Sequence, residues 1–167
     1  MDATADNGHT PPSQGPATDP ASADSPVTYR KILIPVSGKT GGRRSTASLR
    51  HALALHPEEI VLLHVTDPIP GLVGGDSHRQ LLDERRKEAT ATLAQLHALA
   101  EAAGVPVTDR IEAGTVAETI VQVADEIPAD LIVMFTDGVD RLEDLLLGTT
   151  TERVLRGTDI ALLAVRR

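Results

Sequence analysis

The chain has 167 residues, the size of one ordinary domain with an additional segment. Its 24 acidic and 16 basic residues give a formal net charge of -8, which argues against nucleic-acid binding because a basic stripe is the usual footprint of such proteins. Cysteine is absent, so disulfide bonds, thiolate metal sites and cysteine nucleophiles are excluded.

The N-terminal segment, residues 1–28, differs in composition from the rest of the chain. It holds five of the 11 prolines together with mostly Ala, Ser, Thr and Asp, and only Val27 is branched and aliphatic. Such a segment buries too little apolar surface to offset its ordering entropy, so we predict a disordered tail before a domain at residues 29–167. A tether or partner-binding motif is the alternative role for this tail.

The N-terminus also lacks the basic and apolar regions of a signal peptide. Along the whole chain, no apolar run approaches the roughly 18 residues of a membrane span. We therefore expect a cytoplasmic protein with no membrane partner and, from its charge, no nucleic-acid partner.

From Tyr29 onward, apolar runs alternate with helical patterns. Continuous apolar runs predict strands that are buried on both faces, and apolar residues at helical spacing predict helices between them. Strands are expected at residues 31–36, 60–65, 105–112, 131–135 and 160–165, and helices at residues 45–55, 77–103, 115–127 and 149–156. Pro106 suits an edge position for the third strand, and Gly104 suits the C-cap of the helix before it.

Two helix starts have the pattern of a capping box, in which a Thr hydroxyl and a later acidic side chain satisfy backbone N–H groups. Thr115 with Glu118 opens the third predicted helix, and Thr149 with Glu152 opens the fourth. The long second helix is predicted from apolar residues that recur at helical spacing: Leu82, Ala89, Leu93, Leu96 and Ala100.

The alternation of strand and helix predicts an α/β fold, an open parallel sheet with helices on both faces and right-handed crossovers. In such sheets, ligands bind beyond the carboxyl ends of the strands, where the strand order reverses. The loops to consider are therefore residues 37–44, 66–76 and 136–150.

Catalytic patterns are missing from these loops. Residues 38–40 (GKT) end like a phosphate-binding P-loop, but Leu33 stands where the first glycine of that motif is required. The strand ending at Phe135 is superficially like the phospho-acceptor strand of a receiver domain. A receiver requires an Asp at that position, so the sequence argues against a role in phosphorelay. The six histidines have no metal-ligand spacing, and His64 in a buried strand fits a satisfied core residue better than a ligand. We expect no enzyme activity, no catalytic residue and no metal site.

The segments KILIPVSG, IVLLHV, ADLIVM, LLLGTTTERVL and LLAVR resemble the universal stress protein family, in this order and at these distances. The resemblance spans about residues 29–167. It implies a five-stranded, Rossmann-like parallel sheet in the order 3-2-1-4-5 and a homodimer formed through the strand at residues 160–165. It also implies a regulatory role in stress response, exerted through protein partners of unknown identity.

Members of this family divide into ATP-binding and non-binding types. The ATP-binding members share the motif G-x2-G-x9-G-[S/T], whose positions fall here on Phe135, Gly138, Gly148 and Thr149. Ser37 stands where the family usually has an Asp that contacts the nucleoside. By resemblance, Val65 belongs to the adenine side and Thr150 to the phosphate-side backbone. The candidate nucleotide-binding residues are Pro35, Val36, Ser37, Val65, Gly138, Gly148, Thr149 and Thr150.

Phe135 is expected to plug the binding crevice, because a glycine at that point lets backbone and ligand approach closely and a ring does not. The loop that follows would repel a triphosphate, since it is mainly acidic. Its charged residues are Asp137, Asp140, Arg141, Glu143 and Asp144. Lys39, Arg43 and Arg44 of the first loop could neutralise those acids directly.

These observations favour a dimeric regulatory domain with no cofactor and poor or absent binding of ATP. The alternative is a nucleotide-sensing switch that binds ATP, with Mg²⁺, through Gly138, Gly148 and Thr149. An unrelated small α/β enzyme is the third interpretation, and no nucleophile–base or metal pattern supports it.

Overall fold

Strands and helices alternate along the chain in the order that the apolar pattern predicts. A computed structural model describes residues 27–37, 41–66, 68, 75–136 and 148–166. Its elements are β1 (Lys31–Pro35), α1 (Gly41–Leu53), β2 (Glu59–Thr66), α2 (Gly75–Ala102), β3 (Val107–Ala113), α3 (Val116–Glu126), β4 (Leu131–Phe135), α4 (Thr149–Gly157) and β5 (Ala161–Val165). Of the predicted N-terminal tail, residues 1–26 lie outside the described residues.

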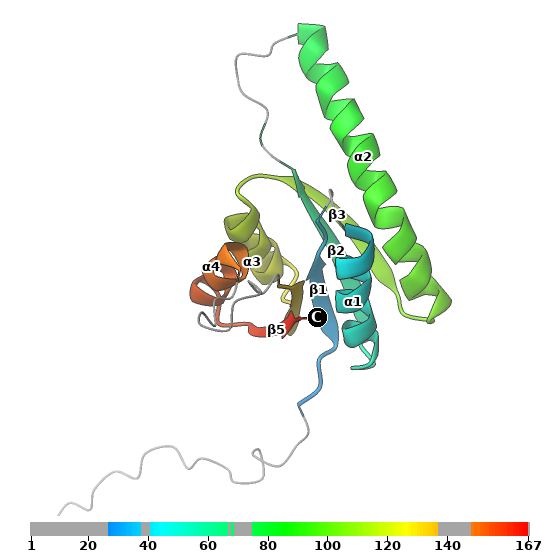
Figure 1. Cartoon of the computed structure of the whole chain (residues 1–167), viewed down its shortest axis with the longest axis vertical. Helices are drawn as coiled ribbons and strands as arrows, with labels where there is room; N and C mark the ends of the chain where they lie inside the picture. The colour runs from blue at the N-terminus through cyan, green and yellow to red at the C-terminus, as the bar shows by residue number, and fades with distance from the viewer. Residues whose placement is uncertain (1–26, 38–40, 67, 69–74, 137–147, 167) are drawn as a thin grey trace, which may run out of the picture.

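The strands form a parallel sheet in the order β3-β2-β1-β4-β5, with α1 and α2 on one face and α3 and α4 on the other (Figure 1). β1 lies between β2 and β4, and Leu33 pairs with Val61 on one side and Ile132 on the other. The predicted α/β sheet, its strand order and the helices on both faces are thus confirmed.

Two apolar clusters, one on each face of the sheet, hold the helices in place. Ile32 and Ile34 of β1 belong to the cluster under α1 and α2, whereas Leu33 belongs to the cluster under α3 and α4. All three side chains are fully buried. Successive side chains of a strand point to opposite faces, so a strand covered on both faces has a continuous apolar sequence.

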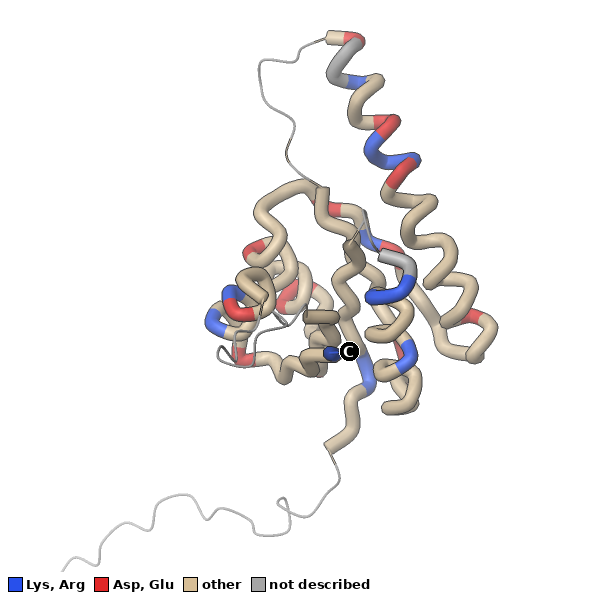
Figure 2. The backbone as a smooth tube through the Cα atoms, viewed as in Figure 1, with Lys and Arg blue, Asp and Glu red and all other residues tan. Residues whose placement is uncertain are grey.

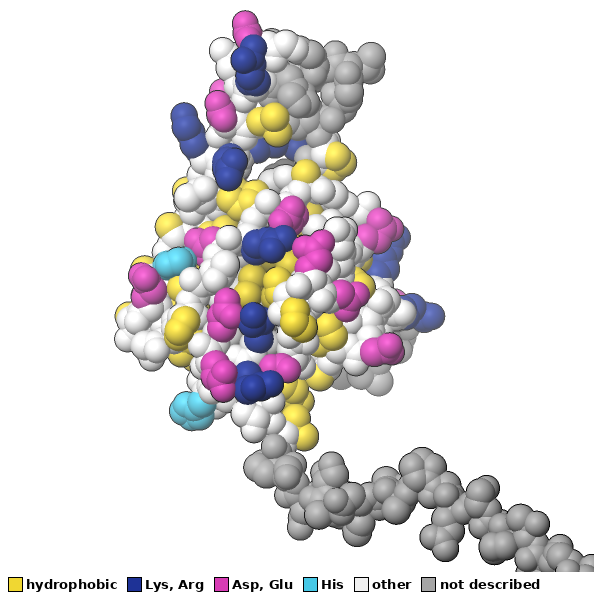
Figure 3. Space-filling model, turned by 180° about the vertical axis from the view of Figure 1, so that it is seen from behind, with side chains coloured by type: hydrophobic (Ala, Val, Ile, Leu, Met, Phe, Trp, Pro, Cys, Tyr) yellow, Lys and Arg dark blue, Asp and Glu magenta, His cyan; other side chains and the backbone are white. Residues whose placement is uncertain are grey.

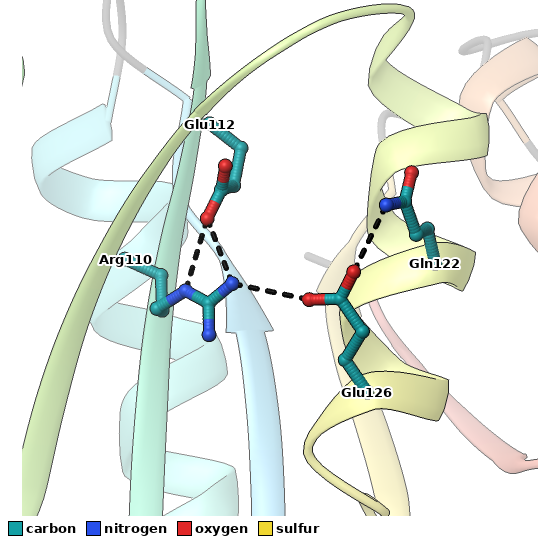
Figure 4. A network of polar contacts seen from close by, with 4 residues as sticks. All are labelled: Arg110, Glu112, Gln122 and Glu126. Carbon is teal, nitrogen blue, oxygen red and sulfur yellow. Dashed lines mark hydrogen bonds and ion pairs between the residues drawn. The ribbon is translucent and has the colours of Figure 1, made fainter.

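β3 is an edge strand, as Pro106 predicts, with one apolar and one polar face. Ile111 packs against the α1–α2 cluster. On the other face, Nε and Nη2 of Arg110 donate to Glu112 at 3.0 and 2.8 Å, and Nη2 also reaches Glu126 of α3 at 3.2 Å (Figure 4). Glu112 first and then Glu126 raise the pKa of Arg110, while burial opposes them. This network ties the edge strand to α3.

α2 is the longest described element, and its N-terminal half projects beyond the sheet (Figure 1). Figure 2 shows acidic and basic residues mixed along this half. The buried stripe consists of Ala89, Leu93, Leu96 and Ala100. Leu82 has the same helical spacing but is 46% exposed, because the apolar spacing continues past the end of the sheet beneath the helix. Gly104, with a φ of 77°, caps the helix as predicted.

Several elements begin at other residues than predicted, and the starts of α1 and β3 have a clear physical reason. α1 begins at Gly41, so Arg43 and Arg44 lie in its first turn and not in a loop. Glycine has low helix propensity, which hides this start in the sequence. β3 begins at Val107 because Pro106 has no N–H to donate to a neighbouring strand.

The helix starts also differ from the predicted capping boxes. Thr115 is the N-cap of α3, but its side chain makes no capping hydrogen bond. The N-cap of α4 is Gly148, so Thr149 is the first helical residue and not the cap. The N–H of Gly148 bonds instead to the hydroxyl of Thr136, which lies just after β4.

Candidate functional site

The sheet has a switch point at its carboxyl edge, between the neighbouring strands β1 and β4. β1 leads into α1 on one face, and β4 leads toward α4 on the other (Figure 1). Ligands of open parallel sheets bind beyond the strand ends at such a point. The connections from the two strands turn to opposite faces of the sheet there and leave a crevice between them. Candidate residues 35–37 lie at the end of β1, and Phe135, the predicted plug, lies at the end of β4.

The end of β1 is held by β2. The N–H of Val36 donates to the carbonyl of Leu63 at 2.7 Å, and the carbonyl of Val36 lies 3.0 Å from Nδ1 of His64. A carbonyl only accepts, so Nδ1 carries the proton in this contact. The half-buried His64 ring thus has a structural partner, in line with its expected role. Val36 is buried, Pro35 is half-buried and Ser37 is exposed.

The end of β4 contacts α1 through the side chain of Phe135. The ring of Phe135 is half-buried and packs against the apolar cluster under α1 and α2. The guanidinium carbon of Arg44 lies 5.8 Å from the ring centroid, within the range of a cation–π contact. The ring therefore lies on the α1 face, and the contact with Arg44 spans the switch point.

The next residue joins β4 to both β5 and α4. Thr136 is buried, and its N–H donates to the carbonyl of Val165 at 2.9 Å. Its hydroxyl oxygen accepts a hydrogen bond from the N–H of Gly148 at 3.2 Å. Gly148, the predicted third glycine of the nucleotide motif, thus has a hydrogen-bond partner inside the protein.

A pocket of about 370 Å³ opens at the same edge, between α3 and α4. It is lined by Pro68, Gly114, Thr115, Val116, Ala117, Thr149, Thr150 and Arg153. This volume is typical of small-molecule sites. Threonine hydroxyls, a cation and the first turns of two helices suit a polar or anionic ligand. We call it the α3–α4 pocket; Phe135 is not among its described lining residues.

The predicted nucleotide-binding residues occupy several places along this edge. Thr149 and Thr150 line the α3–α4 pocket, whereas residues 35–37 stand at the end of β1. Val65 packs beside the apolar cluster on the α3–α4 face. Gly138 lies outside the described residues, as does the acidic loop, so the pairing of that loop with the basic residues stays a prediction.

Part of the pocket was missed by the sequence reasoning. The loops chosen there follow the first, second and fourth strands and leave out the turn after the third, which contributes Gly114. The rule that places ligands beyond strand ends applies to β3 as well and would have indicated that turn. Arg153 has no sequence signal of its own, because an exposed Arg on a short helix is ordinary.

Two further properties concern metals and membranes. In the part of the chain that the structure describes, no three His, Asp or Glu side chains gather closely enough to hold a metal ion. Within the same residues, no helix combines the length and apolarity needed to cross a bilayer.

Comparison with known proteins gives one consistent result. Residues 28–166 match the model of the universal stress protein family. Universal stress protein MJ0531 of Methanocaldococcus jannaschii is 32% identical over 144 residues, with 83% of each chain covered. MJ0577 of the same organism is 27% identical over 157 residues, covering 84% of this chain and 97% of the relative.

Solved structures agree with the sequence comparison. The structure of MJ0577 has a TM-score of 0.67 at 28% identity, covering 84% of this chain and 98% of the other. A structure described as a universal stress protein in complex with cAMP has a TM-score of 0.60 at 22% identity, with 84% of this chain and 98% of that chain covered. At this lower identity, the likeness concerns the fold.

Proposed function

The chain belongs to the universal stress protein family, and from that premise we propose that it is a regulatory, non-catalytic domain that binds ATP poorly or not at all. The position of Phe135 carries this proposal. Its ring stands where ATP-binding members have the first glycine of their motif, and it is packed in place on the α1 face with Arg44 over it. A nucleotide that needs close approach to the backbone would have to displace this ring.

Two further features of the edge weaken binding of a nucleotide. A phosphate oxygen that uses the N–H of Gly148 has to replace the existing bond to the Thr136 hydroxyl. Ser37 stands where the family usually has an Asp, and a neutral hydroxyl makes weaker hydrogen bonds to ribose than a carboxylate does.

The first test is direct analysis of the purified protein for bound nucleotide. Freshly purified protein is denatured, and the supernatant is examined by chromatography and mass spectrometry. The chain has no Trp and a single Tyr, so absorbance near 260 nm comes almost wholly from ligand. Titration of the protein with ATP and Mg²⁺ by calorimetry follows. We expect an empty supernatant and no heat of binding, and stoichiometric ATP or ADP would overturn the proposal.

The second candidate function is an ATP-sensing switch, and the α3–α4 pocket is the observation that favours it. Thr149 and Thr150 match the end of the family's motif, and Arg153 adds a cation beside them. A structurally similar protein is described in complex with cAMP. In this case phosphates would lie at the start of α4, accompanied by Mg²⁺, and the same titration would show saturable binding.

The proposal also includes a homodimer formed through β5, a cytoplasmic location and signalling through protein partners. β5 is an edge strand of mainly half-buried apolar residues, and pairing with a second copy would cover it. Nucleic acid is not among the proposed partners, since acidic and basic side chains are interspersed over the face seen in Figure 3. Turnover of phosphoester or acyl substrates would contradict the non-catalytic role.

A further inference from the structure

The outer edge of β3 is a row of backbone groups that no other described strand pairs with. In the part of the chain that the structure describes, β3 pairs with β2 alone. The carbonyl of Pro106 and the N–H of Gly114 both bond to β2, so the residues of even number face β2 along this strand. The N–H and carbonyl groups of Val107, Asp109 and Ile111 therefore point outward. An edge of this kind can pair with a strand of another copy.

The two edges of the sheet differ in their side chains. β5, at the opposite edge, has the sequence ALLAV and no charged residue. β3 has the sequence VTDRIEA, in which Asp109, Arg110 and Glu112 are charged. The edge proposed for the homodimer is thus apolar, and the other edge is not.

The charged side chains of β3 make polar contacts on both faces of the sheet. On the α2 face, a carboxylate oxygen of Asp109 lies 3.1 Å from Nδ1 of His97. On the α3 face, Nη2 of Arg110 lies 2.8 Å from Glu112 and 3.2 Å from Glu126 (Figure 4). These five side chains are between 31% and 45% exposed, so water still solvates their charged groups.

A strand added to β3 would cover these groups. Neighbouring strands lie about 4.8 Å apart, so side chains of the added strand would lie against Asp109 on one face and Arg110 on the other. Both would lose water, and a charge that loses its solvation without gaining a new partner is destabilised. Charged side chains beside an edge strand therefore oppose pairing with another chain.

We propose that Asp109 and the Arg110–Glu112 pair block strand addition at β3 and so confine association between copies of this protein to β5. The inference goes beyond the proposed function, because it concerns the edge that the proposed dimer leaves open. Two copies joined through β5 would form one sheet with a β3 edge at each end. Pairing of those edges would extend the sheet without limit, and the charged side chains prevent this growth.

The test removes the charges and measures the mass of the full chain in solution by light scattering. Asp109→Val, Arg110→Thr and Glu112→Thr together place good strand formers in β3 and remove one net negative charge. Asp83→Asn removes the same charge from an exposed position of α2 and is the matched control. At micromolar concentration we expect about twice the wild-type mass, or more, for the triple variant, because each open edge joins another copy. Asp83→Asn should keep the wild-type mass.

A second triple variant tests whether the added association uses the backbone of β3. It carries Asp109→Pro with the same two threonine substitutions, so its charge is equal but the outward N–H at position 109 is missing. We expect the wild-type mass for this protein. A first triple variant that is folded by circular dichroism and keeps the wild-type mass would overturn the proposal. Equal growth of the two triple variants would overturn it too, because the association would then not use the edge of β3.

The outcomes separate this inference from the proposed homodimer. A monomeric wild type contradicts the dimer through β5 and leaves the inference in force, with a change from monomer to dimer expected for the first triple variant. A wild type that forms assemblies larger than a dimer, and loses them on Asp109→Pro, has an open β3 edge and overturns the inference. Should the triple variants fail to fold, Asp109→Val and Asp109→Pro as single substitutions take their place, with the same expected difference.

Discussion

The hydroxyl of Thr136 accepts a hydrogen bond from the N–H of Gly148 at 3.2 Å and so joins the end of β4 to the start of α4. Thr136 is only 3% exposed, and Gly148 is the N-cap residue of the helix. A backbone N–H at a helix start has no partner within the helix. Here the hydroxyl of Thr136, the residue after β4, is that partner. This bond also occupies the amide of the residue that is predicted to be the third glycine of the nucleotide motif.

Thr136→Val keeps the shape of the side chain and removes the acceptor. We expect the free energy of unfolding to fall by about 1–3 kcal/mol, because a methyl group replaces the hydroxyl and leaves the N–H of Gly148 without its acceptor. Urea denaturation measures the change. Thr136→Ser retains the hydroxyl, so it should lose less stability than the valine variant. Equal losses in the two variants would show that the hydrogen bond is not the cause.

His97 of α2 faces Asp109 of β3, and this contact predicts that stability depends on pH. Its Nδ1 lies 3.1 Å from a carboxylate oxygen of Asp109, and its Nε2 lies 3.5 Å from Glu101. The contact with Asp109 becomes an ion pair when the imidazole ring is protonated. The contact with Asp109 is the largest cause that raises the pKa of His97 above 6.5, burial opposes it, and the charges of Asp109 and Glu101 add to it.

A raised pKa means that the folded state holds the proton more tightly than the unfolded chain. The stabilisation is therefore complete below pH 6.5 and is lost as the pH rises through the raised pKa. We expect His97→Gln to lower the free energy of unfolding more at about pH 5.5 than at about pH 8.5. Asp109→Asn should remove most of this difference, and an equal effect of His97→Gln at both pH values would contradict the prediction.

The strands of the sheet interior were predictable, because the burial of such a strand on both faces is visible in its own few residues. Leu131–Phe135 form β4 as expected, since a parallel strand covered on both faces has a continuous apolar sequence. The strand order came from the resemblance, because alternation alone does not specify which strands are neighbours. The exposure of Leu82 was not predictable in this way, because helical spacing does not reveal where the sheet beneath a helix ends.

The candidate site was less predictable, because it combines segments that are distant in sequence. Phe135 could be recognised as a departure from a motif, but its contact with Arg44 depends on a helix start hidden by two glycines. The α3–α4 pocket joins Gly114 to Arg153, and their proximity follows from how α3 and α4 pack. Such pairings are tertiary and have no local pattern.

The outer edge of β5 gives a specific test of the proposed homodimer. The N–H of Thr136 bonds to the carbonyl of Val165, so the backbone of Val165 faces β4 and that of Ala164 faces outward. Ala164→Pro therefore removes an outward N–H without removing a bond to β4. We expect a dimer for the wild type and for Ala164→Ser, and a monomer for Ala164→Pro, by light scattering at micromolar concentration. A monomeric wild type would contradict the prediction.

Gly114 is required at the turn from β3 into α3 because of Thr119. A Cβ atom at position 114 would lie 2.5 Å from Oγ1 of Thr119, and that side chain is buried. The N–H of Gly114 also donates to the carbonyl of Thr66 at 3.0 Å, which holds the turn against β2. The turn therefore cannot move away from Thr119 without disturbing its hydrogen bond to β2.

Gly114→Ala should therefore lower the free energy of unfolding by about 1–3 kcal/mol, the usual effect of forcing extra atoms into a packed region. Thr119→Ala removes the opposing hydroxyl and methyl groups and lowers stability on its own by leaving a small cavity. Because the added methyl group of Gly114→Ala fits into that space, the double variant should lose less stability than the two single losses together. Thermal or urea denaturation of the three variants and the wild type gives the free energies of unfolding for this double-mutant cycle. Additive losses would mean that the backbone conformation of Gly114, and not the contact with Thr119, makes glycine necessary there.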